Sequence, residues 1–159
     1  MAERAVSRWE RDEAATAATR ARPPVSEDQL QAVLEAHPDL DANGYPGWRV
    51  HSNRRGQLPH PTHERDRAAL LASLDDVDRA SRWIRSIAWT SKVSKSAMTS
   101  YGLKHVVEAM PGELGGYLTN GAFIAACLVD DVPLKFEDSP NPVVGLDVRT
   151  VNDARSRNS

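Results

Sequence analysis

Hydrophobic side chains recur every three or four residues in four segments of this chain, and that spacing predicts amphipathic helices. The first segment follows Ser26-Glu27-Asp28-Gln29. This order is typical of a capping box, in which a serine and a glutamine each satisfy a free backbone N–H at a helix start. The apolar stripe of Leu30, Val33 and Leu34 then runs as far as Pro38. We therefore predict a helix of about three turns here.

The longest segment predicts one continuous helix from His63 to Trp89. Its apolar positions keep helical spacing and include Leu70, Leu74, Val77, Ile84 and Ile87. Before it, residues 39–62 contain several Gly, Pro and Asn breakers. Such breakers indicate turns and loop, with a short strand expected at Trp48 and Val50.

Two shorter helices and a hairpin are predicted after residue 98. Residues 99–110 carry one apolar stripe, and residues 119–132 carry a second that includes Phe123, Ile124, Cys127 and Leu128. Residues 134–137 and 143–148 alternate around a proline-bounded turn, which predicts a short β-hairpin. The last ten residues are polar, and we expect them to be disordered.

These elements predict a mostly α fold: a small helical domain with a C-terminal β-hairpin. We expect one α-rich domain over residues 25–148, a flexible N-terminal arm over 1–24 and a flexible tail over 149–159. The order of helix, turn, apolar helix and hairpin over residues 99–148 matches a winged helix-turn-helix. The alternative is that the apolar helix at 119–132 simply fills the core, a common role that needs no partner.

Composition restricts the setting of the protein. No stretch of the sequence approaches the ~20 apolar residues of a membrane span, and the single cysteine, Cys127, excludes an internal disulfide. Cys127 follows two alanines on an apolar helix face, so we expect a buried, inert thiol. We therefore predict a cytoplasmic protein with no membrane partner.

The net charge of −2 conceals an uneven distribution along the chain. Residues 79–107 contain six cations and no acid, whereas acids predominate from Glu108 to Asp147. Cations in such a block are candidates for phosphate contacts, and an asparagine on the apolar helix is a candidate for a base contact. The candidate nucleic-acid-binding residues are Arg79, Arg82, Arg85, Lys92, Lys95, Lys104 and Asn120. Against this hypothesis, residues 119–133 contain no cation, and Asp130 and Asp131 would repel phosphates.

A loop with three histidines is the remaining candidate for chemistry. His51, His60 and His63, with Glu64 beside them, are residue types that bind zinc. Their spacing on proline-broken backbone matches no established zinc motif, so we interpret them as exposed loop histidines. We predict no metal, no cofactor and no catalytic residues.

The segments Ser100–His105 and Tyr117–Ala126 carry a resemblance. Together they resemble uncharacterised small proteins of bacterial phages, plasmids and integrated elements, over residues 100–126. The resemblance implies no activity and no functional residues. It favours an accessory role near DNA over metabolic catalysis, by association only.

Two functional hypotheses follow, both without catalysis. In the first, the chain is a DNA-associated accessory or regulatory protein of a mobile element that binds double-stranded DNA. In the second, it is a protein–protein interaction or assembly module, such as a phage or complex structural component. The second would hold another protein, or itself, through an exposed patch around Trp83, Trp89 or Tyr101.

Overall fold

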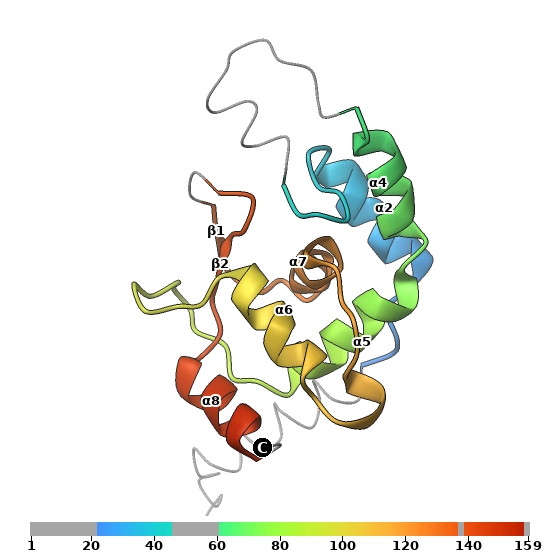
Figure 1. Cartoon of the computed structure of the whole chain (residues 1–159). Coiled ribbons are helices and arrows are strands. Elements are labelled where there is room, and N and C mark those ends of the chain that lie inside the picture. The colour runs from blue at the N-terminus through green and yellow to red at the C-terminus, as the bar shows by residue number, and fades with distance from the viewer. Residues whose placement is uncertain (1–21, 46–60, 137–138, 158–159) are drawn as a thin grey trace, which may run out of the picture.

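The computed structural model describes residues 22–45, 61–136 and 139–157. Within these ranges lie six α-helices, one 3-10 turn and one antiparallel hairpin (Figure 1). In chain order they are α2 (Glu27–Ala36), α4 (His63–Leu71), α5 (Leu74–Arg85), α6 (Ser100–Glu108), η1 (Gly112–Leu114), α7 (Asn120–Val129), β1 (Leu134–Lys135), β2 (Val143–Val144) and α8 (Val148–Ser156). The predicted mostly helical fold with a C-terminal hairpin is confirmed.

Helix α7 is the centre of the fold. Every residue from Asn120 to Cys127 is buried, and α2, α5 and α6 all contact this helix (Figure 1). Alanines at 122, 125 and 126 are fully buried, and their small side chains let the neighbouring helices approach closely. The segment is therefore a core helix, as the alternative interpretation of its sequence expected, and this stretch has no open face to enter a DNA groove.

Among the described residues, Trp83 and Phe123 are the largest side chains that are fully buried. Trp83 on α5 is 1% exposed and Phe123 on α7 is 0% exposed, and their ring centroids lie 6.3 Å apart. Aromatic burial of this kind contributes several kcal/mol, roughly 25 cal/mol per Å² of apolar surface removed from water. Trp83 is thus not available for the exposed patch proposed from the sequence.

The single long helix predicted from His63 to Trp89 is wrong. Helix α4 ends at Leu71 and α5 begins at Leu74. Between them the Ser73 hydroxyl donates to the carbonyl of Leu70 at 2.7 Å, a local bond that competes with continued helix. Leu70 on α4 and Val77 on α5 both lie in the core, where each is 0% exposed.

Threonine and serine side chains fix the starts of three helices. The capping box at Ser26 is present, with Gln29 bonding back to the Ser26 backbone. Thr99 and Thr119 cap α6 and α7 by accepting from the backbone N–H groups three residues on. These caps define where the two helices that carry the candidate site begin.

The C-terminal segment departs from the sequence interpretation. The hairpin pairs only two residues per strand, Leu134 with Val144 and Lys135 with Val143. The tail expected to be disordered forms α8, which begins where the Asp147 carboxylate accepts from the Arg149 N–H at 2.8 Å. Val151 and Ala154 of α8 are buried, so this helix belongs to the folded body.

None of the helices in the described ranges has the length and apolar content that crossing a bilayer requires. Several sequence interpretations lie outside the described residues: most of the N-terminal arm, the strand at Trp48 and Val50, and the histidines His51 and His60.

Candidate functional site

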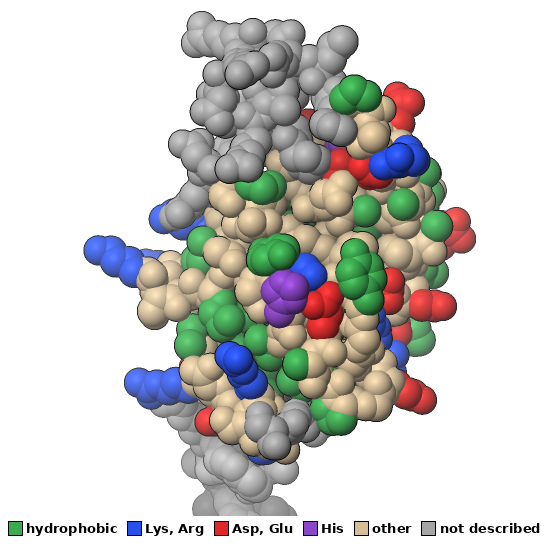
Figure 2. Space-filling view, viewed as in Figure 1, with side chains coloured by type: hydrophobic (Ala, Val, Ile, Leu, Met, Phe, Trp, Pro, Cys, Tyr) green, Lys and Arg blue, Asp and Glu red, His purple; other side chains and the backbone are tan. Residues whose placement is uncertain are grey.

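A pocket of about 430 Å³ opens between α6, the segment that leads into α7, and the turn at residues 41–44. We call it the tyrosine pocket. It is lined by Ala42, Asn43, Tyr101, Lys104, His105, Glu108, Tyr117, Thr119 and Asn120. The same mixture of types, with a histidine, a basic and an acidic side chain between hydrophobic ones, gathers near the middle of the face in Figure 2.

One face of α6 supplies four of the lining residues. Tyr101, Lys104, His105 and Glu108 recur at spacings of three, one and three, and positions at such spacings share one side of a helix. The opposite side carries Leu103, Val106 and Val107, all buried in the core. The amphipathic pattern of α6 therefore orients its polar face toward the pocket.

Glu108 ties the two principal walls of the pocket together. Its Oε1 accepts from Lys104 Nζ at 3.0 Å and from the Leu118 N–H at 2.9 Å. Its Oε2 lies 2.6 Å from His105 Nδ1. Burial raises the pKa of this carboxyl, but the hydrogen bonds from Leu118, Lys104 and His105 outweigh it and leave the pKa below its usual value. Glu108 is therefore an ionised anchor whose two oxygens are both engaged.

Two tyrosine rings flank the ammonium group of Lys104. Lys104 Nζ lies 5.2 Å from the ring centroid of Tyr101 and 5.8 Å from that of Tyr117, within cation–π range. Tyr101 is 50% exposed and also meets His105 edge to face at 4.7 Å. Tyr117 is 78% exposed. The rim of the pocket thus presents open aromatic surface above a lysine that is almost completely buried.

Arg79 on α5 holds the backbone that carries Tyr117. Its Nη1 donates to the carbonyls of Leu114, Gly115 and Gly116 at 2.8–3.0 Å, and its Nη2 donates to the carbonyl of Tyr117 at 2.6 Å. A planar guanidinium suits this role because it offers several N–H donors in fixed directions. Arg79, proposed from the sequence as a DNA contact, acts instead as a positioning residue for the pocket rim.

At Gly121 and at Gly115, two segments of backbone around the pocket pack directly against each other. A Cβ on Gly121 would lie 1.9 Å from the carbonyl oxygen of Asp41, and one on Gly115 would lie 1.8 Å from that of Met110. The Gly121 N–H also donates to the Ala42 carbonyl at 3.0 Å. Only glycine fits either position, so the 41–44 turn sits directly on the start of α7.

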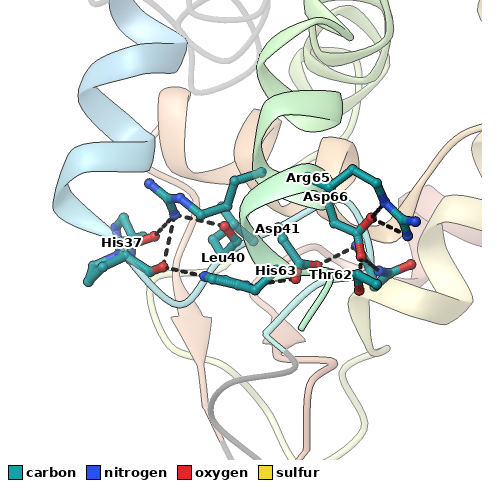
Figure 3. A network of polar contacts seen from close by, with 10 residues as sticks. His37, Leu40, Asp41, Thr62, His63, Arg65 and Asp66 are labelled. Atoms are coloured by element: carbon teal, nitrogen blue, oxygen red, sulfur yellow. Dashed lines mark hydrogen bonds and ion pairs between the residues drawn. The ribbon is translucent and has the colours of Figure 1, made fainter. Parts of the chain in front are cut away.

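The 41–44 turn, which supplies Ala42 and Asn43, forms the third wall of the pocket. A polar network around residues 37–41 holds this turn in place (Figure 3). His63 Nδ1 lies 2.9 Å from Asp41 Oδ2, and His63 Nε2 lies 2.9 Å from the Pro38 carbonyl. Arg67 adds bonds to the carbonyls of Leu34, His37, Pro38 and Leu40. These contacts hold the chain between α2 and the 41–44 turn in one conformation.

His63 is not the exposed loop histidine that the sequence indicated. It is the first residue of α4, is 7% exposed, and has a protein partner at each ring nitrogen. A metal would have to displace one of those partners. In the described part of the chain no three His, Cys, Asp or Glu side chains gather where an ion would bind.

The structure separates the seven side chains proposed to contact DNA. Four of them, Arg79, Arg85, Lys104 and Asn120, are at most 8% exposed. Lys104 and Asn120 come together in the tyrosine pocket. Lys92 and Lys95 are exposed on the connection before α6, and Arg82 is half exposed beside Asp78 and Glu113.

Arg85 belongs to a second, buried cluster. Its Nε donates to Asp130 Oδ1 at 3.0 Å, and the Ser81 hydroxyl donates to Asp130 Oδ2 at 2.6 Å. Asp130 caps the C-terminus of α7, where the helix dipole disfavours an acid, and Arg85 compensates that charge. Asp130 therefore faces into the protein and joins α7 to α5.

Six lining residues were missed from the sequence, among them Thr119, the residue that caps α7. His105 and Glu108 could have been found, because with Tyr101 and Lys104 they complete the polar face opposite a recognised apolar stripe. Tyr117, Asn43 and Ala42 had no comparable signal, since they come from turns that only the fold brings to α6.

Neither family models, nor curated proteins, nor solved structures show a match to this chain.

Proposed function

We propose that this chain is a non-catalytic binding protein and that the tyrosine pocket is its binding site. The observation that carries the proposal is the contrast between the rim and the floor. Tyr101 and Tyr117 leave half or more of their surface open, whereas Lys104 and Glu108 below them are bonded and largely buried. Concave sites with aromatic surface and a few convergent polar groups are typical of ligand binding.

The framework of the pocket supports binding because it is formed before any ligand arrives. Arg79 holds the Tyr117 backbone, Glu108 holds the Leu118 N–H, and Gly121 seats the 41–44 turn. A site whose walls are already ordered loses little conformational entropy when it is filled.

The chemistry of the lining favours binding over turnover. No serine or cysteine is among the nine lining residues, and the Thr119 hydroxyl oxygen accepts the Ala122 N–H as a helix cap. His105 is oriented by Glu108 as a general base would be. However, none of the contacts of His105 within the described residues is to a hydroxyl or thiol nucleophile.

A protein partner is the second candidate, favoured by the exposure of Tyr117. A tyrosine that is 78% exposed at a pocket rim is the kind of side chain that becomes a hot spot in protein interfaces. Trp83, one of the three side chains first considered for such a patch, is buried, whereas Tyr101 is half exposed. Binding of duplex DNA stays a prediction, with four of its seven proposed residues buried.

Ligand screening by amide NMR tests the proposal. We expect at least one class among sugars, amino acids, aromatic acids and nucleotides to shift amides of α6 and of residues 117–121. Tyr117→Ala should weaken that binding, while Lys95→Ala, a change on the exposed connection before α6, should not. Concentration-dependent shifts of the same amides without ligand would indicate self-association through the pocket. A folded protein whose pocket amides respond to none of these would contradict the proposal.

A further inference from the structure

We propose that the ligand of the tyrosine pocket is a nucleotide unit, meaning a flat base that carries a phosphate; this inference rests on the binding role proposed above. Three features of the lining select that chemistry: the charges left open to a ligand, the open ring faces, and the polar groups on the wall beside α7.

The charges left open to a ligand favour an anion. Both carboxylate oxygens of Glu108 are engaged by donors of the protein. Among the described residues, Lys104 Nζ has one oxygen partner, Glu108, so two of its three N–H bonds remain for other acceptors. His105 uses Nδ1 toward Glu108, which leaves Nε2 for a ligand. A phosphate accepts charge-assisted hydrogen bonds from both groups.

The rings favour a flat, conjugated group next to that anion. Tyr101 and Tyr117 both lie within 6 Å of Lys104 Nζ, so an anion bound at Lys104 places its attached group against one ring or the other. Nucleobases stack on aromatic side chains regardless of base type. The 78% exposure of Tyr117 leaves the surface for such stacking open.

The wall beside α7 favours a base over a plain aromatic ring. Asn43, Thr119 and Asn120 line it with amides and a hydroxyl. Asn120 Nδ2 donates to Asn141 Oδ1 at 2.8 Å, while Asn120 Oδ1 is buried and accepts no hydrogen bond from the described residues. A base edge carries donors and acceptors that suit such a wall, whereas a phenyl edge has none.

The same chemistry can come from a free nucleotide or from an unpaired base in a single strand. In both cases the phosphate contacts Lys104 and the base stacks at the rim. Duplex DNA does not offer this arrangement, because its bases are stacked on one another.

The test is a titration of the full chain followed by amide NMR and calorimetry. The probes are adenosine monophosphate, adenosine, inorganic phosphate, benzoate and a short single-stranded oligonucleotide. We expect adenosine monophosphate to bind more tightly than adenosine, phosphate or benzoate, with shifts at residues 101–108 and 117–121. Tighter binding of the oligonucleotide than of the mononucleotide would identify a strand as the source, and the reverse would identify the free nucleotide.

Variants separate stacking from charge. Tyr117→Leu should weaken binding by roughly tenfold, since stacking of one base is worth about 5- to 140-fold in affinity, whereas Tyr117→Phe should leave it within about twofold. Lys104→Met should also weaken binding, and its matched control is Lys92→Met, which removes the same charge from an exposed site. Lys104→Met and His105→Gln each leave Glu108 with one partner fewer. His105→Gln makes the change at an exposed side chain, where it disturbs packing less, and so provides a second test of the anion contact.

Three results would overturn the inference: no binding of either nucleotide probe at millimolar concentration, nucleotide binding that Tyr117→Leu leaves unchanged, or tighter binding of benzoate than of adenosine monophosphate. If sugars or aromatic acids fill the pocket while nucleotides do not, the nucleotide assignment fails and the binding role stands. If nothing shifts the pocket amides, both fail together.

Discussion

At the scale of single residues, the pocket depends on side chains that the sequence presents as ordinary. Gly121 looks like one small residue in an apolar helix, yet its missing Cβ is what admits the Asp41 carbonyl. Arg79 looks like one cation in a basic run, yet four carbonyls of residues 114–117 accept its hydrogen bonds. In both cases the role comes from a partner distant in sequence.

Gly121→Ala should destabilise the protein by about 3 kcal/mol, because the new methyl group overlaps backbone that cannot move aside as a side chain would. The measurement is the free energy of unfolding by urea denaturation. Gly102→Ala is the control: its Cβ meets neighbours at an ordinary 3.6 Å, and a glycine replaced by alanine within a helix gains up to about 1 kcal/mol. Equal effects of the two changes would show that the 41–44 turn is not seated on α7.

At the scale of elements, a carboxylate joins α6 to the segment that enters α7. Glu108 lies at the last position of α6, and its oxygens accept from one backbone N–H and two side chains. Because these bonds need the ionised form, they hold its pKa below the usual value in the folded protein. The connection between the two elements therefore depends on pH.

The lowered pKa of Glu108 determines how the free energy of unfolding should change with pH. The unfolded chain binds a proton at Glu108 more readily than the folded protein, so the stabilisation is complete above the ordinary glutamate pKa and is lost as pH falls through the lower folded pKa. Urea unfolding of the native protein and of Glu108→Gln, measured from pH 6 to about pH 3, should show the smaller acid loss in the variant. If the free energy of unfolding changed with pH in parallel for the two proteins, the proposed role of ionised Glu108 would be contradicted.

At the scale of the whole molecule, one hydrophobic cluster extends from α2 to the C-terminal helix. Val151 and Ala154 of α8 belong to the same buried cluster as Trp83 and Leu30. The Asp147 N–H also donates to the Ala88 carbonyl at 2.8 Å, which ties the start of α8 to the chain after α5. We therefore expect α8 to unfold together with the body rather than separately.

Val151→Ala should lower the free energy of unfolding by about 1–3 kcal/mol, because it removes two buried methyl groups. Tryptophan fluorescence, to which the buried Trp83 contributes together with the three other tryptophans of the chain, should show the same shift of a single transition as circular dichroism. Asn152→Ala, at an exposed position of the same helix, should change stability by less than about 0.5 kcal/mol. An unchanged fluorescence transition in Val151→Ala would mean that α8 is an independent appendage.

The sequence by itself determined the features that depend on neighbours along the chain. The capping box at Ser26, the apolar stripe of α7 and the short hairpin were all predictable, because caps, helical periods and turns are set within a few residues. Even the polar face of α6 was readable in principle from its spacing. The break at Ser73 and the start of α8 at Asp147 were missed. Each depends on one local side-chain hydrogen bond, in a segment whose sequence also fits a continuous helix in the first case and a disordered tail in the second.

Only the tertiary structure decided which charged side chains are exposed and which segments come together to line the tyrosine pocket. From the sequence, Arg79 and Arg85 were interpreted as exposed cations. An arginine is rarely buried without partners, and in this chain those partners lie far away in the sequence. Here those partners are the carbonyls of residues 114–117 and the carboxylate of Asp130. The tyrosine pocket likewise combines residues 42–43, 101–108 and 117–120, and no local pattern relates three segments that are joined only by packing around α7.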